Sequence, residues 1–478
     1  MSRYFAIASL LVALVPGRAP ANGPAQTPPQ APLAPHQQLA YDIYKQLIEI
    51  NTTNSVGNTT IAADAMAARL RAAGFPATDI FVGGPTPRKG NLVARLRGKA
   101  ASTRKPLLLL AHIDVVEANK ADWSQDLDPF KLTEKDGYFY GRGTVDDKAM
   151  AAIFTANLIR MKQMGAVPDR DIILALTADE EGGDYNGVDW LLKNQRALVD
   201  AEFGLNEGGG GQAKGGRRLA NRVQAGEKVY VDYTLEVTNK GGHSSQPQAE
   251  NAIYLLADAL AKISKFSFPA TVNEITREYF SKMSGLETGQ LAADFKSVSQ
   301  PTPDPAAMAR LSAIPLYNAA LRTTCVATQA SAGHAPNALP QRATANVNCR
   351  IMPGEDPAEV QRTLARVIAD ARVSVTPVAA AKPSPPSPLT PQLMETITRI
   401  TEEMWPGVVV VPFMSVGATD GLYFRQIGVP IYGVSGLFGD MDDVRAHGRD
   451  ERMGIKDFYD GQEFLWWLVT AITGVARR

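Results

Sequence analysis

The chain has 478 residues, enough for two domains with hydrophobic cores of their own. Its 49 Lys and Arg residues balance its 49 Asp and Glu residues, so the charge gives no reason to expect nucleic acid or an anionic membrane as a partner. Its two cysteines, Cys325 and Cys349, are too few for a zinc–thiolate site. They lie equally far from Asn337 on either side. A hairpin turning there would place them opposite one another, as a disulfide or as two separate buried thiols.

The N-terminus has the pattern of an export signal. Residues 1–21 contain Arg3, an apolar run from residue 4 to residue 15, and small residues before a plausible cleavage point after Ala21. The run is too short to span a bilayer, with an uncleaved N-terminal anchor as the alternative, and no later stretch is apolar for long enough. Residues 22–36 are rich in Pro, Ala and Gln and predict a flexible leader. We therefore expect an exported protein, periplasmic or extracellular, with no stable membrane span.

Helical spacing of apolar residues begins at residue 39 and again at residue 62, and a strand is predicted at 92–96. The first stretch that suggests catalysis follows at residues 107–116, LLLLAHIDVV. Four consecutive leucines predict a strand that is buried on both faces of a parallel sheet. His112 and Asp114 follow it two residues apart, so in an extended chain their side chains point the same way. This is the C-terminal end of a buried strand, where open α/β sheets bind their ligands.

Acidic residues end the next strands as well. The glycine-rich segment 138–148 carries Asp146 and precedes a helix at 148–164. The buried strand 171–177 runs into Glu180 and Glu181, a helix follows near 187–197, and Glu207 stands before a run of glycines. Strands and helices that alternate in this way predict a doubly wound α/β domain, which we place at 37–226.

The pattern changes at residue 227. Apolar and polar residues alternate over 229–237, which indicates a one-sided antiparallel strand, and further paired strands are predicted at 323–329 and 343–351 with a helix at 358–370. The region 265–320 gives no clear pattern. A Pro-rich joint at 379–389 leads back to helix–strand alternation, including strands at 408–414 and 429–435 and a closing helix around 461–473. The sequence thus predicts an α/β catalytic domain with a mixed, mostly parallel sheet, built from 37–226 and 383–478 and interrupted by a smaller α+β lid and dimerisation domain at 227–382.

The polar residues at the strand ends share one chemical interpretation. Carboxylates that gather without lysines repel one another unless a cation holds them. Imidazole together with carboxylate suits Zn²⁺, and two ions bridged by one carboxylate form a hydrolytic site. Any one acid could instead be a helix cap or a solvated turn residue, but the pattern recurs at several strand ends. The set is His112, Asp114, Asp146, Glu180, Glu181 and Glu207, with His447 near the C-terminus.

Several segments together resemble one family. They are LLLLAHIDVV, DGYFYGRGTVDDKAM, LTADEEGG, NEGGGG, NKGGHSSQP, NALPQRATANVNCRIMPGE, GATD and AHGRDER. In this order they are similar to the di-zinc metallopeptidase family of aminoacylase, glutamate carboxypeptidase and succinyl-diaminopimelate desuccinylase, closest to the carboxypeptidase S / N-acyl-amino-acid hydrolase branch. Glu207, where relatives that hydrolyse carbamoyl groups have histidine and aminopeptidase-type members prefer aspartate, favours the acylase and carboxypeptidase side.

The resemblance implies a complete metal site with two Zn²⁺ per chain, or Co²⁺ or Mn²⁺ on the same ligands. It implies that His112, Glu181 and Glu207 bind terminally, that His447 completes the ligands of the second metal, and that Asp146 bridges the ions, with a cis Asp146–Asp147 peptide. Asp114 would hydrogen-bond His112 and fix its tautomer. Glu180 would be the general base, taking a proton from the metal-bridging water and passing it to the leaving nitrogen.

The resemblance also assigns residues of the insert. His243 would stabilise the oxyanion, often from the partner subunit of a homodimer, rather than being a turn histidine. Asn337 and Arg350 would hold the free carboxylate of the substrate; alternation along 347–351 leaves Arg350 on the opposite strand face from its apolar neighbours. Without the family, Arg350 could equally form a surface salt bridge. Gly417 and Thr419 would add contacts from the GATD turn.

We therefore expect an exported zinc-dependent hydrolase that cleaves an amide next to a free α-carboxylate, in short peptides or N-acyl amino acids. An aminopeptidase or dipeptidase on the same metal site is the alternative, and a catalytically silent binding relative is a further one. The acyl or side-chain preference is not predictable, because the pocket walls lie in region 265–320.

Overall fold

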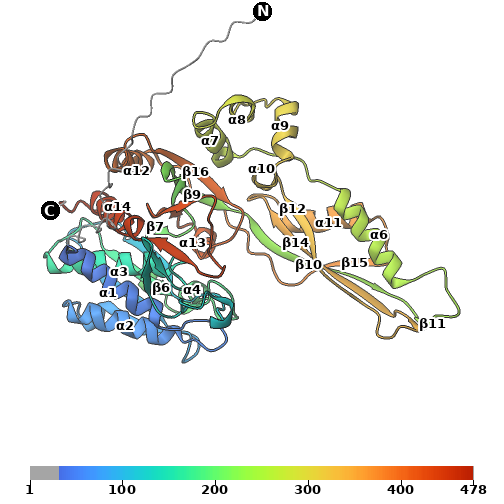
Figure 1. The fold of residues 1–478 in the computed structure, drawn as a ribbon, viewed down its shortest axis with the longest axis horizontal. Coiled ribbons are helices and arrows are strands. Elements are labelled where there is room, and N and C mark those ends of the chain that lie inside the picture. The colour runs from blue at the N-terminus through green and yellow to red at the C-terminus, as the bar shows by residue number, and fades with distance from the viewer. Residues whose placement is uncertain (1–31, 477–478) are drawn as a thin grey trace, which may run out of the picture.

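The computed structural model describes residues 32–476, and Figure 1 shows its two largest sheets side by side along the long axis. The large sheet has the order β1-β2-β6-β3-β7-β17-β9-β8-β18, with β16 paired to β9. Its centre, β6-β3-β7-β17, is parallel, and antiparallel pairs occur at β1–β2–β6 and β8–β9–β17. The strands are β1 (Ile80–Gly83), β2 (Asn91–Leu96), β3 (Leu107–His112), β6 (Ile172–Thr177), β7 (Phe203–Asn206), β8 (Gly211–Lys214), β9 (Arg217–Glu227), β16 (Val409–Ser415), β17 (Ile431–Gly433) and β18 (Phe438–Asp440).

Helices cover both faces of this sheet, as the doubly wound pattern predicts. Every residue of β3 and of β6 is buried, which explains why these strands are apolar throughout rather than alternating. One face carries α1 (Pro35–Glu49), α2 (Thr59–Ala72), α3 (Lys148–Gln163), α12 (Pro391–Met404) and α14 (Ile455–Thr473). The other carries α4 (Gly187–Asn194), α5 (Arg196–Val199) and α13 (Gly421–Gln426). The fold class is therefore confirmed as α/β with a mixed sheet.

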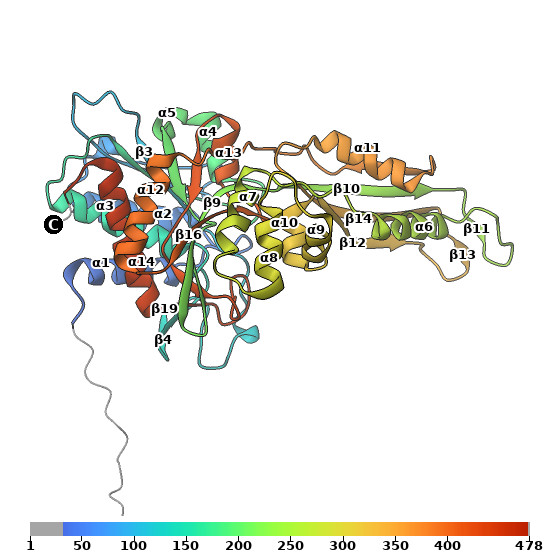
Figure 2. The same ribbon diagram turned by 90° about the horizontal axis from the view of Figure 1, so that it is seen from above.

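A second sheet, of order β12-β14-β10-β15, is built by the inserted segment. Its strands are β10 (Val229–Thr238), β12 (Thr324–Ala332), β14 (Arg342–Ile351) and β15 (Val373–Pro377). Apolar residues of β10 and β14 face a core that is closed by α6 (Ala252–Lys265) and α11 (Pro357–Ile368), while the polar residues between them form the opposite face. Both views show the sheet reaching away from the large sheet toward a small antiparallel ribbon of β11 (Gly242–His243) and β13 (Ala338–Leu339), which we call the distal ribbon (Figures 1 and 2).

The two cysteines pair across neighbouring strands. Cys325 on β12 stands directly opposite Cys349 on β14, and the two form a disulfide. The predicted hairpin therefore has the register that the equal spacing about Asn337 suggests, and of the two alternatives the disulfide is the one formed.

The region without a sequence pattern folds into four helices. They are α7 (Glu274–Met283), α8 (Gly289–Val298), α9 (Pro305–Ser312) and α10 (Pro315–Leu321), and they share a core with Ala220 of β9 and Val411 of β16. Although it lies inside the inserted segment, this helical group therefore packs against the large sheet rather than into the core of the small one.

Some boundaries differ from the sequence-based prediction. α1 begins at Pro35, so the last two residues of the expected leader are helical, and α14 begins six residues before the predicted helix at 461. The segment predicted as one helix near 187–197 is divided into α4 and α5 at Gln195. The expected signal peptide, 1–21, lies outside the described residues. Within residues 32–476, no helix combines the length and the apolar character that crossing a membrane requires.

Candidate active site

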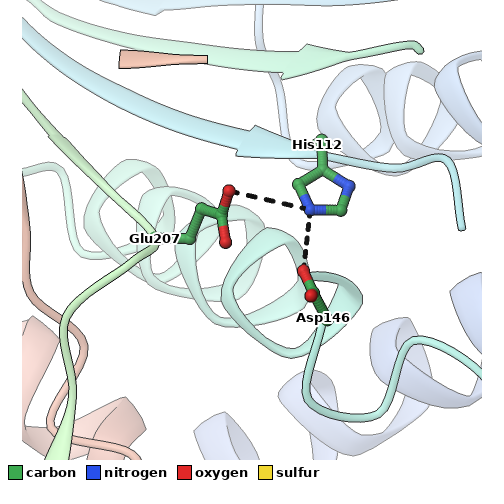
Figure 3. A group of neighbouring side chains, drawn as sticks. All are labelled: His112, Asp146 and Glu207. Atoms are coloured by element: carbon green, nitrogen blue, oxygen red, sulfur yellow. Dashed lines mark hydrogen bonds and ion pairs between the residues drawn. The ribbon is translucent and has the colours of Figure 1, made fainter. Parts of the chain in front are cut away.

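His112, Asp146 and Glu207 meet at the C-terminal edge of the parallel strands (Figure 3). His112 ends β3, Glu207 follows β7, and Asp146 stands just before α3. The His112 Nε2 atom lies 3.0 Å from Asp146 Oδ1 and 3.9 Å from Glu207 Oε1. Because the imidazole is buried and both carboxylates are directed at the same nitrogen, these three residues form one candidate metal-ligand group.

A second group shares Asp146 with the first. His447 Nε2 lies 3.1 Å from Asp146 Oδ2 and 2.9 Å from Glu181 Oε2. In each group the ligand atoms lie within 4.8 Å of one another. The structure thus brings together all five residues that were predicted as ligands, and Asp146 stands between the two groups, as the predicted bridge requires. The peptide bond between Asp146 and Asp147 is cis, as predicted.

The electrostatics of these groups suit a cation. The carboxylates of Asp146 and Glu181 raise the pKa of His447 to about 10. Burial alone would lower the pKa of His112, but the neighbouring Asp114 and Asp146 raise it well above its usual value. Burial and the charge of Asp146 raise the pKa of Glu207. The cluster therefore holds more negative charge than its two imidazoles neutralise easily, which is the condition that bound metal ions relieve.

A residue that the sequence analysis missed fixes the loop carrying Asp146. The buried Glu451 carboxylate pairs with Arg142 at 2.7 Å. It also accepts hydrogen bonds from the backbone N–H groups of Gly143, at 3.0 Å, and Val145, at 2.7 Å. Glu451 lies four residues after His447, so the C-terminal AHGRDER segment supplies both a ligand and the support of the bridging residue. Only that proximity to His447 could have indicated it.

Asp114 acts differently from the prediction. The Nδ1 atom of His112 lies 3.1 Å from the backbone carbonyl oxygen of Asp114 and 3.6 Å from its carboxylate. The carboxylate instead accepts the backbone N–H groups of Glu180, at 3.1 Å, and Glu181, at 3.0 Å. The tautomer of His112 is therefore set mainly by a carbonyl, which the turn after β3 brings to the ring, and the Asp114 side chain fixes the segment with the expected base.

Glu180 belongs to neither ligand group and faces a cavity of about 360 Å³. Burial and, after it, the charge of Glu207 raise the pKa of Glu180 well above its usual value. The cavity is bounded by the two chain crossings between the sheets, around Lys228–Asp232 and Val378–Ser384, and by Tyr423 of α13. A carboxyl group beside the metal ligands that also borders an open cavity has the position that a general base needs.

Arg350 lies beside this cavity, on the polar face of the small sheet. Its guanidinium stands 4.5 Å from the centre of the Tyr230 ring and donates to Asn348 Oδ1 at 3.3 Å. The nearby Asp232 carboxylate is occupied by other donors, the Tyr230 hydroxyl at 2.6 Å and the amides of Asn346 and Asn348. Within residues 32–476 Arg350 forms no ion pair, so its positive charge remains available to an anionic ligand. The alternation predicted for β14 is confirmed.

His243 and Asn337 are not near the ligand groups of the same chain. His243 belongs to the distal ribbon, and the Asn337 carbonyl accepts the Ser244 N–H at 3.0 Å. Both views place this ribbon at the far end of the molecule from the large sheet (Figures 1 and 2). The two predicted residues therefore adjoin one another, but one chain alone does not bring them to the site.

The GATD turn differs from the expected direct contact. The buried Thr419 hydroxyl donates to Glu227 at 3.0 Å, and the Gly417 N–H donates to Ser415 Oγ at 3.1 Å. Both groups are therefore already used within the protein. The next residue, Asp420, was not predicted; its carboxylate accepts from Thr177 at 2.8 Å and from Asn186 at 2.6 Å, which ties the turn to the end of β6.

Comparison with known proteins agrees with this geometry. The model of peptidase family M20/M25/M40 matches residues 108–470. The N-fatty-acyl-amino acid synthase/hydrolase PM20D1 of Xenopus tropicalis is 32% identical over 355 residues, 73% of this chain and 69% of that protein. The probable carboxypeptidase S-like 2 of Dictyostelium discoideum is 31% identical over 374 residues, 76% of this chain and 71% of that protein.

The fold is shared with solved structures. The M20 family metallo-carboxypeptidase Sso-CP2 from Sulfolobus solfataricus superposes with a TM-score of 0.66 at 18% identity, over 90% of this chain and 98% of that chain. The ligand geometry, the family match and the relatives lead to the same conclusion. The chain belongs to peptidase family M20/M25/M40 and is a metallohydrolase of the peptidase and amidohydrolase type.

Proposed function

We propose that the chain is an exported, zinc-dependent hydrolase that cleaves an amide bond next to a free α-carboxylate, in short peptides or N-acyl amino acids. The observation that carries the proposal is the cavity that Glu180 shares with Tyr230 and Asp232, since the Tyr230 ring lies 4.5 Å from the Arg350 guanidinium. A substrate lying there has its amide at the carboxylate cluster and its anionic end at a guanidinium.

The donor sets fit a pair of metal ions. Each group offers one imidazole nitrogen and two carboxylates, and the two groups share Asp146. Such nitrogen and oxygen donors suit Zn²⁺, and Co²⁺ or Mn²⁺ could use the same ligands. A bound metal pair supplies Lewis-acid polarisation of a carbonyl oxygen and makes a water molecule more acidic.

The chain's own residues move the proton. Glu180 takes a proton from the attacking water as the new C–O bond forms, and delivers it to the nitrogen as the C–N bond breaks. The bond is cleaved to a carboxylic acid and an amine, with the proton passing through one side chain. Asp114 supports this step because its carboxylate accepts the backbone N–H of Glu180 and thereby fixes the backbone from which the side chain of the base extends.

Recognition of a free carboxylate rests on Arg350. A planar guanidinium can bind a carboxylate through two parallel hydrogen bonds, which gives both affinity and orientation. The Asp232 carboxylate favours this role because it accepts from three other donors and forms no ion pair with Arg350 among the described residues, which leaves the guanidinium N–H groups for a ligand.

A homodimer would complete the site with His243. The Nδ1 atom of His243 accepts the Ser245 N–H at 3.2 Å, so its neutral tautomer carries the proton on Nε2 and can donate to an oxyanion. The insert also offers a surface for pairing, since β12 is an edge strand whose last seven residues, 326–332, are exposed and uncharged. An unprotected edge of this kind pairs readily with a second strand.

Export is supported by the disulfide. Disulfides persist in oxidising compartments and are rare in the cytosol. The Cys325–Cys349 disulfide links strands β12 and β14 of the insert. Its presence agrees with the signal-like sequence at residues 1–21.

The decisive experiment combines metal analysis with two matched substrates, an N-acyl amino acid with a free carboxylate and its C-terminal amide. About two zinc ions per chain and cleavage of the free acid alone are expected. Equal cleavage of both, or a requirement for a free amino terminus, would contradict the role of Arg350 and favour an aminopeptidase or dipeptidase. Two bound metals with no hydrolysis of any amide would favour a binding relative.

A further inference from the structure

The segment that carries the expected base is fixed almost residue by residue from outside. The Ala178 N–H donates to Asn91 Oδ1 at 2.9 Å, and the N–H groups of Glu180 and Glu181 donate to Asp114. Asp179, between them, has a left-handed backbone with φ of 57°, which side chains other than glycine rarely adopt. Each of these four residues thus needs a partner to hold the segment in this shape.

The partner of Asp179 is Lys89, in the loop before β2. The Lys89 Nζ atom lies 2.5 Å from Asp179 Oδ1 and 2.7 Å from Asn54 Oδ1. The Asp179 side chain is fully buried and that of Lys89 is one-tenth exposed. A buried ion pair of this kind has little solvent screening, so the attraction between the ammonium and the carboxylate is strong.

The loop that carries Lys89 is itself held by hydrogen bonds. The neighbouring Arg88 donates to the carbonyl oxygens of Gly57 and Ser55, and the Arg88 carbonyl accepts the Thr59 N–H at 3.0 Å. The loop before β2 is therefore hydrogen-bonded to the loop before α2. From the loop before β2, the Lys89 side chain extends toward Asp179, which follows β6.

We propose that Lys89 is a positioning residue for Glu180: by holding Asp179 in its left-handed conformation, it directs the next side chain toward the cavity and the metal-ligand groups. The inference rests on the proposed role of Glu180 as the base. It can be separated from a purely structural role, because removing one partner of a buried ion pair is destabilising, whereas replacing both partners by neutral groups is often tolerated.

The test uses the whole chain with its metals and three variants. Lys89→Met removes the ammonium, and Lys89→Met/Asp179→Asn also removes the partner charge, so that no unpaired carboxylate remains buried. Lys99→Met is the matched control, since its exposed ion pair with Asp169 lies away from the site. The kcat, the KM, the metal content and the Tm are measured for each, on whichever amide the wild type cleaves in the substrate experiment above.

If Lys89 positions the base, kcat falls by about 10²-fold in Lys89→Met, while KM and the two metals stay as in the wild type. The double variant regains most of the Tm but remains slow, and Lys99→Met is unchanged. Should Lys89→Met not fold, the neutral double variant gives the same answer. Unchanged kcat, recovery of kcat together with Tm in the double variant, or loss of metal in parallel with activity would each overturn the proposal. Failure of the proposed function shows itself separately, in the wild type's choice of substrate.

Discussion

The two parts of the proposed site are held in opposite ways. On the large sheet, the His112 ring is held by the Asp114 carbonyl, and the backbone N–H groups of Asp146 and Glu181 donate to the carboxylates of Glu451 and Asp114. On the insert, His243 is exposed in the distal ribbon, and Arg350 is held by the Asn348 amide oxygen and the Tyr230 ring. Metal ligands must be in place before the ions bind, whereas groups that contact a substrate must let it enter. In the proposed mechanism the rigid half, on the large sheet, holds the metals and the base, and the open half, on the insert, supplies Arg350 for recognition and His243 for the oxyanion.

Removal of the metals should have the largest effect. A chelator is expected to abolish hydrolysis and to lower the Tm, because the clustered carboxylates then repel one another around two imidazoles. Activity and Tm are followed during chelation and after Zn²⁺ is returned. Activity that survives complete chelation would contradict the assignment of the rigid half as the reactive one.

Glu180→Gln should lower the activity nearly as much as metal removal does, although the metals stay bound. The amide cannot accept the proton, so kcat should fall by roughly 10²- to 10⁴-fold. Metal content is measured on the same sample, and it should stay at the wild-type level because Glu180 lies outside both ligand groups. If the metals were lost with the activity, Glu180 would be a ligand rather than a base.

The site of the rigid half was largely predictable from sequence, because each ligand follows a buried strand or a glycine turn and strand ends of a parallel sheet meet at one edge. The support of these ligands was not predictable. Glu451 and Arg142 are 309 positions apart and meet only through the fold. The four helices in 265–320 were not recognised because each has ten residues or fewer, too few for a clear helical repeat of apolar residues.

Side-chain roles were harder to predict than side-chain positions. The spacing of His112 and Asp114, two residues apart after a buried strand, predicted correctly that both lie at the site. Only the turn after β3 determines that the carbonyl of Asp114, rather than its carboxylate, contacts the His112 ring. Thr419 is similar, because its hydroxyl turns to Glu227, a residue from the distant end of β9. Sequence spacing fixes neighbours along the chain and says little about which of several polar atoms they use.

Mixing two inactive variants tests whether the open half comes from a second chain. His243→Ala should lower kcat by about 10²-fold if the imidazole stabilises an oxyanion. When His243→Ala and Glu180→Gln chains are unfolded, mixed and refolded, half of the dimers should combine both kinds. Each such dimer has one intact site, so about a quarter of wild-type activity should return. No recovery, with dimers shown to have exchanged, would place His243 outside the partner's site.

Arg350→Ala should affect recognition and not the chemical step. Loss of a charged hydrogen-bonding pair predicts a KM about 10- to 10²-fold higher for the free acid, with kcat nearly unchanged. The matched control is Arg342→Ala, at the far end of the same strand face, whose exposed side chain pairs with Glu236. Equal effects of the two variants would remove Arg350 from the binding site.

The disulfide should matter least to activity, although it lies next to Arg350 in sequence. Cys349 faces the core of the insert while Arg350 faces the opposite side, and β14 stays paired with β10 along its whole length. Cys325→Ala/Cys349→Ala should therefore cost roughly 3 kcal/mol in the free energy of unfolding, as expected for a link across 24 positions, with kcat and KM nearly unchanged. Chemical unfolding and steady-state kinetics on the same variant measure both. A KM that rises for the free acid alone would mean that the disulfide stiffens the strand under Arg350, and the open half would then be less free than its exposed contacts indicate.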